Sequence, residues 1–450
     1  MISCLSCVHD HNFHKGQEFL CPVVFASVCT SWREIAVSTS RLWAHIDLVP
    51  NANPSHKLYC RARTWLDRAG NAPLHVHVRE KSLAKDEDIA ELTNFISPYV
   101  GRVCTFYVES ECHTPDLFES ILACWLEHGL PGSTKTLALR RPQPIPLLAS
   151  LGPQELRRLP RERLGGFVQP LRVLHLHNVC IGWGAGAIYQ GLLELQIESM
   201  ADTAGPTLNQ LVEVLRGCSR LQKLKLARMK FRHEDINEVP SVHLPHLQDL
   251  NLLGANAEVL RRLLPTLDTG AAPLNMSISL GAQADLFEEL GTFFDHSNLS
   301  TLFIETQRQD WIPRLFCCLK RLRTLVIGNL VLTQNIYGDS TAIASSERPP
   351  ELAICASLST LSFVGCNLAF GPLQNMLKVH PTLRVLDLWR SKLSISDTQT
   401  RTHESLPDVA LPVLADLVPQ VTHSSCPKQY PMSSWYVSDG HDASSVRVPL

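Results

Sequence analysis

LSTLSFVGCNL, residues 358–368, is the stretch that decides the fold of this chain. Its apolar residues Leu358, Leu361 and Phe363 follow the spacing apolar-x-x-apolar-x-apolar, and Cys366 and a final leucine come after them. Apolar residues at alternate positions are typical of a strand that buries one face. We therefore predict a strand here that packs on one side only.

The same spacing recurs along the chain. Complete copies lie at Leu171, Leu174, Leu176; Leu192, Leu195, Ile197; Leu221, Leu224, Leu226; Leu247, Leu250, Leu252; Leu299, Leu302, Ile304; Leu322, Leu325, Ile327; Leu358, Leu361, Phe363; and Leu383, Leu386, Leu388. They start 21, 29, 26, 52, 23, 36 and 25 residues apart, and a degenerate copy with Met276 and Ile278 divides the gap of 52 into 26 and 26. A period of this length is typical of leucine-rich repeats.

The segments between the copies carry helical periodicity. Their apolar faces are Leu208, Leu211, Val212 and Leu215; Val259, Leu260, Leu263 and Leu264; and Leu286, Phe287, Leu290 and Phe294. A unit of strand, turn and helix hides only one face and needs its neighbours to hide the rest. The predicted fold class is therefore α/β, a leucine-rich-repeat solenoid with a curved parallel sheet inside and helices outside.

We expect this array to extend over residues 49–419. Its strand and helix positions before the complete copies are Leu74, Val76, Val78, Val103 to Val108, Leu117, Ile121, Leu122 and Trp125. Residues 141–169, rich in Pro, Arg and Gly, and the polar residues 333–350 are predicted insertions. Residues 1–20 are predicted to be irregular, and residues 420–450, with few paired apolar residues, to be weakly ordered.

Working outward from the array, residues 24–48, VFASVCTSWREIAVSTSRLWAHIDL, resemble a docking helix joined to a first strand. The apolar positions are Val24, Phe25, Val28, Trp32, Ile35 and Ala36. This spacing predicts one helix over 24–37 with a wide apolar stripe. A Ser-Thr-Ser run then ends the helix, because such side chains compete for backbone hydrogen bonds. Ile46 and Leu48 alternate as in a strand.

A family resemblance becomes visible in this segment. Val28-Cys29-x-x-Trp32-Arg33-x-Ile35-Ala36 followed by Leu42-Trp43 is similar to the second half of the F-box of fungal, basidiomycete-like F-box proteins. RTWLDRAGNAPLHVHV, residues 63–78, resembles a stretch common after fungal F-boxes, and the array resembles the irregular repeats of F-box/leucine-rich-repeat proteins. The family opens with a Leu-Pro-x-Glu helix that residues 1–20 do not match. Either the motif has decayed, or this N-terminus is not the natural one.

The resemblance implies a function and partners. Proteins of this family are substrate receptors of Skp–cullin–F-box ubiquitin ligases, so it implies a Skp-type adaptor and, through it, a cullin. The residues expected to contact the adaptor are Phe25, Val28, Trp32, Leu42 and Trp43. The array would bring a target protein near another enzyme, so the chain would need no catalytic residue. The alternative is a leucine-rich-repeat interaction module without ligase function, in which Trp32 and Trp43 only cap the array.

The residues between the apolar strand positions are expected to face outward on the inner curve. They are His175, His177, Glu194, Gln196, Glu198, Lys223, Lys225, Asp249, Asn251, Asp387 and Trp389. Together they predict a surface that is acidic near Glu194–Glu198 and basic near Lys223–Lys225, with Trp389 as an exposed aromatic anchor. Long concave faces of this kind bind extended partners, so we predict that the unknown target protein binds here.

Composition excludes several classes of function. The net charge of the 450 residues is −2, so no overall field attracts nucleic acid or anionic lipid. Phe19 to Cys29 is too short to span a bilayer, contains Pro22, and lacks the basic flank of a signal peptide. We expect a cytoplasmic or nuclear protein. The 15 cysteines are scattered and odd in number, which favours free thiols.

Few residues are arranged as in a chemical site. One cluster of soft ligands is Cys4, Cys7, His9, His11 and His14. Only three residues separate Cys7 from His11, whereas a zinc finger uses about twelve. Gly182 to Gly186 lacks the Lys-Ser/Thr of a phosphate loop, and neither Gly-x-Ser-x-Gly nor His-Glu-x-x-His occurs. We therefore predict that the chain is not an enzyme and has no metal site and no cofactor.

Overall fold

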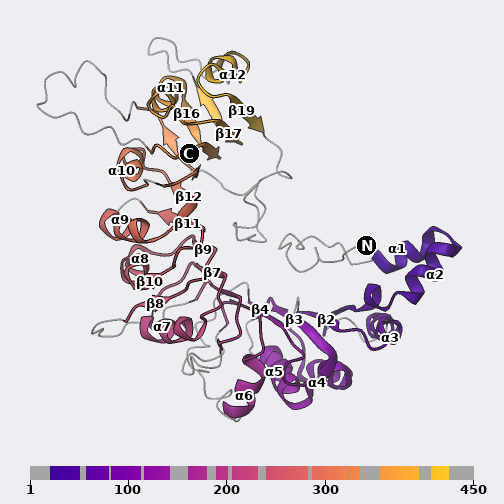
Figure 1. Ribbon diagram of the computed structural model, residues 1–450. Coiled ribbons are helices and arrows are strands. Elements are labelled where there is room, and N and C mark those ends of the chain that lie inside the picture. Colours follow the sequence, from indigo (N-terminus) through magenta and orange to yellow (C-terminus); the bar gives the residue numbers. More distant parts are fainter. Residues whose placement is uncertain are drawn as a thin grey trace, which may run out of the picture. The chain divides into compact units, whose positions relative to one another are not determined.

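The computed structural model contains two compact units, each built of parallel strands and helices (Figure 1). Among the described residues, the first unit ends at Val179 and the second begins at Tyr189. The described residues are 21–50, 57–80, 83–112, 116–141, 161–179, 189–200, 205–231, 240–281, 286–319, 321–334, 336, 355–394 and 407–424. The predicted α/β class with parallel strands and intervening helices is confirmed.

The first unit has five strands that pair in chain order. They are β1 (His45–Leu48), β2 (Leu74–Glu80), β3 (Val103–Ser110), β4 (Thr136–Arg140) and β5 (Val173–His177). Its helices are α1 (Cys21–Val28), α2 (Thr30–Ser38), η2 (Ser40–Trp43), α3 (Lys57–Ala69), α4 (Asp86–Ile96), η3 (Ser97–Arg102), α5 (Asp116–His128) and α6 (Arg161–Val168). Every pair from β1 to β5 is parallel, as crossover helices between strands require.

The second unit repeats the same plan. Its main strands are β6 (Glu194–Glu198), β7 (Lys223–Ala227), β9 (Asp249–Leu252), β11 (Leu274–Leu280), β12 (Leu299–Thr306), β13 (Thr324–Gly328), β15 (Thr360–Val364), β17 (Val385–Trp389) and β19 (Gln420–Ser424). Its helices are α7 (Leu208–Gly217), α8 (Ala257–Leu263), η7 (Leu264–Thr266), α9 (Phe287–His296), α10 (Trp311–Cys318), α11 (Phe370–Val379) and α12 (Pro407–Ala415). Two small parallel sheets accompany it: β8 (Val242–His243) with β10 (Leu267–Asp268), and β14 (Val331–Leu332), β16 (Asn367–Ala369) and β18 (Lys392–Ser394).

The repeated apolar positions stack in register between neighbouring strands. Leu361 of β15 pairs with Leu386 of β17, and Phe363 pairs with Leu388. All four side chains are fully buried. A repeat that hides one face against its neighbours produces this stacking. The spacing found in the sequence is therefore the spacing of the core.

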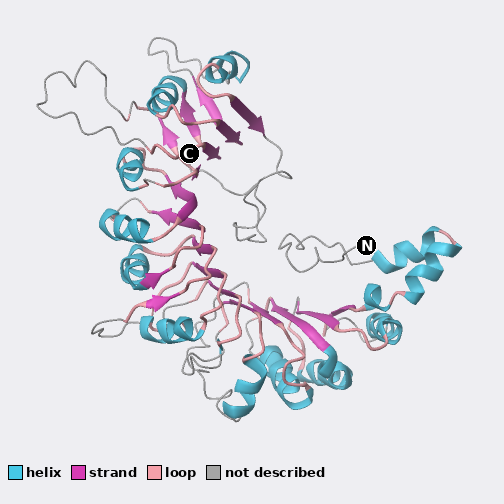
Figure 2. Ribbon diagram, in the orientation of Figure 1, coloured by secondary structure: helices cyan, strands magenta, loops and turns pink. Residues whose placement is uncertain are grey.

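In each unit the helices lie on one side of the strands, and Figure 2 shows this arrangement. Helix α11, for example, buries Leu373 and Met376 on the side of the strands that carries the leucines. Strand side chains alternate between the two sides of a sheet. We name as the open face the strand side chains that alternate with these core positions.

Two predicted boundaries change in the structure. The end of the array at residue 419 is wrong, because Gln420–Ser424 forms β19 and pairs with β17. The insertion predicted at 141–169 extends too far at its C-terminal end, because residues 161–168 belong to a helix. Residues 161–168 form α6, whose Phe167 packs edge-on against Trp125 with ring centroids 5.1 Å apart. Residues 1–20, 142–160, 337–354 and 425–450 lie outside the described residues.

A left-handed residue follows several of the strands. Its positive φ occurs at Asn178, Ser199, Arg228, Asn329, Arg390 and Gly365, each directly after a strand, and at Gly254 one residue later. The chain leaves the strand here and turns toward its helix. Since an L side chain strains this conformation, a glycine is the favoured residue at such a turn.

Gly365→Ala should lower the free energy of unfolding of the second unit by about 1–2 kcal/mol, because Gly365 has a φ of 62°. Gly291→Ala is the matched control. Gly291 lies in α9 of the same unit, and a Cβ added there meets Cys318 Sγ at 3.7 Å, an ordinary van der Waals contact. Alanine is the better helix former, so the control should be neutral or stabilising by up to about 1 kcal/mol. Urea denaturation measures both, and equal destabilisation by the two variants would contradict the prediction.

Candidate functional site

Helices α1 and α2 carry most of the exposed apolar surface found in the described part of the chain. Ten large hydrophobic side chains there are exposed, and six of them lie between residues 23 and 37. The six are Val23, Val24, Val28, Trp32, Ile35 and Val37. Exposed apolar side chains that gather on one short segment mark interaction sites more often than isolated exposed residues do. We name these six residues the apolar patch.

The patch is built by two short helices and not by the single helix predicted over 24–37. Cys29 has extended backbone, with φ −158° and ψ 176°, and separates α1 from α2. The break falls at a Cys-Thr-Ser sequence, whose residues have low helix propensity. The rings of Phe25 and Trp32 then stack with centroids 5.5 Å apart, and Arg33 Nε donates to the Ala26 carbonyl oxygen over 2.9 Å. These contacts hold α1 against α2.

Trp43 does not belong to the exposed surface, although it was predicted to contact an adaptor. Its side chain is fully buried, and its Nε1 donates to the Ala36 carbonyl oxygen over 2.6 Å. Trp65 packs edge-on against it, and the Arg68 guanidinium lies 4.2 Å from its ring centroid. Trp43 therefore attaches α2 to the first repeat and is a packing residue.

The remaining predicted adaptor contacts differ in exposure. Val28 is 61% exposed and Trp32 is 45% exposed, so both are available to a partner. Phe25 and Leu42 are half-buried. The exposed part of this surface is therefore narrower than the predicted set, and Ile35, 62% exposed, belongs to it as well.

The predicted target-binding residues lie on the open face, but they are not equally accessible. Lys223 is exposed, and the half-buried members are His175, His177, Asp249, Asp387 and Trp389. Glu194, Glu198 and Lys225 are buried, with 7–8% of each residue exposed. The expectation that these three face solvent is wrong. Trp389, expected as an exposed anchor, is only partly accessible.

Strand pairing explains the burial of these charges. β6 and β7 are neighbours, and Lys225 Nζ lies 2.6 Å from Glu198 Oε1. Glu194 accepts a hydrogen bond of 2.6 Å from Gln196 Nε2, and the Arg228 guanidinium lies 3.9 Å from Glu198. The acidic and basic surfaces predicted from the sequence are therefore partly neutralised by the Glu198–Lys225 ion pair between two adjacent strands.

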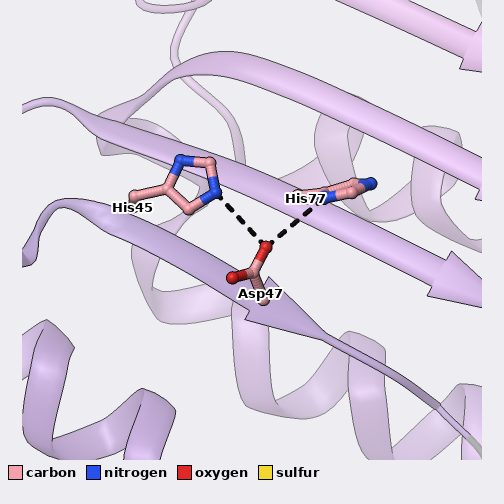
Figure 3. Close-up of side chains that lie close together, drawn as sticks. All are labelled: His45, Asp47 and His77. Carbon is pink, nitrogen blue, oxygen red and sulfur yellow. Dashed lines mark hydrogen bonds and ion pairs between the residues drawn. The ribbon is translucent and has the colours of Figure 1, made fainter. Parts of the chain in front are cut away.

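The open face of the first unit carries polar residues that the sequence analysis overlooked. In Figure 3, Asp47 of β1 lies between two histidines: its Oδ1 is 3.2 Å from His45 Nε2 and 3.3 Å from His77 Nδ1. Burial acts to raise the pKa of Asp47, but hydrogen bonds from the two histidines outweigh it and hold this pKa well below the ordinary value. The carboxylate is therefore ionised throughout the physiological pH range.

A second charged group on this face joins β2, β3 and β4. The Glu109 carboxylate forms ion pairs with Arg79 Nε at 3.4 Å and with Arg140 Nε at 3.7 Å. The pKa of Tyr107 is raised to about 12, mainly by burial and secondly by the negative charge of Glu109. In the sequence, polar side chains alternate with core positions in HIDL of β1 and LHVHVRE of β2. This alternation places His45, Asp47, His77 and Arg79 on the open face. Their meeting depends on strand register, which no local pattern shows.

Comparison with known proteins adds no identification: the chain matches no family model, and no curated protein is significantly similar to it. No helix in the described ranges combines the length and the apolar character needed to cross a bilayer. The apolar patch and the open face are the two candidate binding surfaces of the described residues. The cluster Cys4, Cys7, His9, His11 and His14 lies outside the described residues.

Proposed function

We propose that this chain is a substrate-recognition subunit of a Skp–cullin–F-box ubiquitin ligase. The observation that carries the proposal is the apolar patch of α1 and α2, which directly precedes an array of strand–helix repeats. The patch would bind a Skp-type adaptor and, through it, a cullin. The array would bind the target protein, whose identity is open.

The apolar patch has the composition of a binding surface. Trp32 is 45% exposed and Ile35 is 62% exposed. Both are large apolar side chains, and removing them from water lowers the free energy. Exposed tryptophans of this kind commonly supply much of the energy of an interface. Phe25 stacks on Trp32 and so restricts its ring before binding. Trp32 would therefore lose little side-chain entropy when a partner binds.

The connection between patch and array supports the two-ended arrangement of a receptor. Trp43 is fully buried and hydrogen-bonds to the last turn of α2, so the patch is packed onto the first repeat and not tethered by a loop. An adaptor on the patch and a target on the array would then be held by one chain. Such an arrangement accelerates another enzyme through proximity and requires no catalytic group of its own.

On the open face, the accessible residues define where a target would bind. Lys223 is exposed, and Asp387 and Trp389 are half-buried. Mixed charges and a partly accessible aromatic residue suit a protein partner. Since the net charge is only −2, the surface does not favour a nucleic acid.

The second candidate function is a leucine-rich-repeat interaction module without ligase activity. The burial of Trp43 favours it, because that residue caps the array whether or not an adaptor binds. The two functions share the open face and differ in the partner of the apolar patch. Adaptor binding therefore separates them.

Trp32→Ala is expected to weaken binding of the purified full-length chain to a Skp-type adaptor by about 30-fold or more, the effect of losing an interface hot spot. Isothermal titration calorimetry measures the affinity. Leu83→Ala is the matched control, because Leu83 is an exposed apolar residue, at 63%, outside the patch. Circular dichroism should show unchanged folding for both variants, since neither side chain is buried.

Two results would overturn the proposal. One is the absence of adaptor binding by the full-length chain. The other is an equal loss of affinity in Trp32→Ala and Leu83→Ala, which would show that the apolar patch is not the contact surface. Lys223→Ala, on the open face, should leave adaptor binding unchanged.

A further inference from the structure

His45, Asp47 and His77 meet on the open face of the first unit because of strand geometry. His45 and Asp47 are two residues apart on β1, so they point to the same side. Asp47 pairs with His77 in the parallel register of β1 and β2. One carboxylate oxygen and two imidazole nitrogens therefore converge from two adjacent strands (Figure 3).

The distances between these atoms fit the ligand shell of a small divalent cation. Asp47 Oδ1 lies 3.2 Å from His45 Nε2 and 3.3 Å from His77 Nδ1. Zinc bonds to nitrogen and oxygen of about 2.0–2.1 Å in a tetrahedron place neighbouring ligand atoms about 3.3 Å apart. All three ligand atoms lie within 4.8 Å of one another. Closing the two imidazoles on an ion thus needs a movement of at most about 1.5 Å.

The orientation of the His77 ring suits binding through Nδ1. Nε2 of His77 is buried and has no hydrogen-bond partner. The ring also packs edge-to-face against Tyr107, with centroids 4.5 Å apart and planes at 84°. This packing holds the ring so that Nδ1 faces Asp47. A metal bound at Nδ1 would take the lone pair of that nitrogen and leave the proton on Nε2.

Solvent can reach the three side chains. The side chains of His45, Asp47 and His77 are 27%, 26% and 29% exposed, respectively. Three protein ligands with an accessible fourth position are typical of a zinc site that also holds water or a partner's ligand. Two imidazoles and one carboxylate suit zinc better than magnesium or calcium, which prefer oxygen ligands.

We infer that His45, Asp47 and His77 form a zinc site on the open face of the first unit, with its fourth position open to water or to a side chain of a bound protein. The ion would join β1 to β2 and so tie the strand next to the apolar patch to the array. The inference is independent of the proposed ligase function, because it rests on three side chains of two paired strands.

The test is zinc binding by the metal-stripped full-length chain, carrying Cys4→Ser and Cys7→Ser so that the N-terminal thiols cannot compete. Calorimetry with Zn²⁺ alone should give one equivalent, with a Kd on the order of micromolar or tighter. Asp47→Asn keeps the shape of the side chain but removes the anionic ligand. It should weaken binding by about 100-fold or more, beyond the cost of losing an outer-sphere partner.

His175→Ala is the control, because His175 is a half-buried histidine on β5 of the same unit. It should leave the affinity unchanged. Co²⁺ in place of zinc should give visible absorption bands of a four- or five-coordinate ion, and Asp47→Asn should abolish them. Zinc should also raise the melting temperature of the parent and not of His77→Gln. No zinc binding by the parent, or equal binding by parent and Asp47→Asn, would overturn the inference.

Discussion

Trp43→Ala is expected to lower the free energy of unfolding of the first unit by about 3–5 kcal/mol, the usual cost of truncating a buried tryptophan. The side chain is fully buried, so alanine leaves a cavity between α2, η2 and α3. It also removes the hydrogen-bond donor of the Ala36 carbonyl oxygen. Urea denaturation monitored by circular dichroism measures the change.

Trp32→Ala provides the comparison within the same residue type. Trp32 is 45% exposed and stacks on Phe25, so the expected cost is only about 1 kcal/mol. Trp43→Phe keeps most of the packing and should cost less than Trp43→Ala. Similar destabilisation by Trp43→Ala and Trp32→Ala would contradict the assignment of Trp43 to the core and Trp32 to the surface.

Lys225→Ala is expected to destabilise the second unit by about 3 kcal/mol, because it removes the ammonium group that pairs with the buried Glu198 carboxylate. Lys225 Nζ lies 2.6 Å from Glu198, whereas the Arg228 guanidinium is 3.9 Å away. The residues Lys225 and Glu198 are only 8% and 7% exposed. Chemical denaturation at pH 7 measures the loss.

Lys223→Ala is the matched control, because Lys223 lies two residues earlier on β7 and is exposed. Its expected effect is within about 0.5 kcal/mol. A double variant, Glu198→Gln with Lys225→Met, should recover part of the stability lost in Lys225→Ala, since no uncompensated charge remains. Equal effects of Lys223→Ala and Lys225→Ala would show that the ion pair is not buried.

The apolar patch could be located from the sequence but not described fully. The spacing of Val28 and Trp32 predicted an apolar helical surface at this place, and both residues are exposed there. The single predicted helix was wrong, and Trp43, predicted to contact an adaptor, is fully buried. A helix break depends on one residue's backbone, here Cys29, and burial depends on what packs against the side chain.

On the open face, the sequence predicted the orientation of the side chains but not their partners. Alternation along each strand correctly placed Lys223 and Lys225 on the same side, because side chains of a strand alternate with a period of two. The sequence could not show that Glu198 on the neighbouring strand pairs with Lys225. Two surfaces expected to bind partners by charge are therefore partly consumed by an internal ion pair.

By itself, the sequence determined the repeat, the α/β class, the parallel strands and the core leucines. These features follow from a local periodicity that recurs in each strand–helix repeat. Only the tertiary structure decided which polar residues meet. Asp47 and His77 are 30 residues apart and become neighbours through the register of β1 and β2. That register results from the packing of the whole repeat, so it cannot be predicted from the pattern within a single strand.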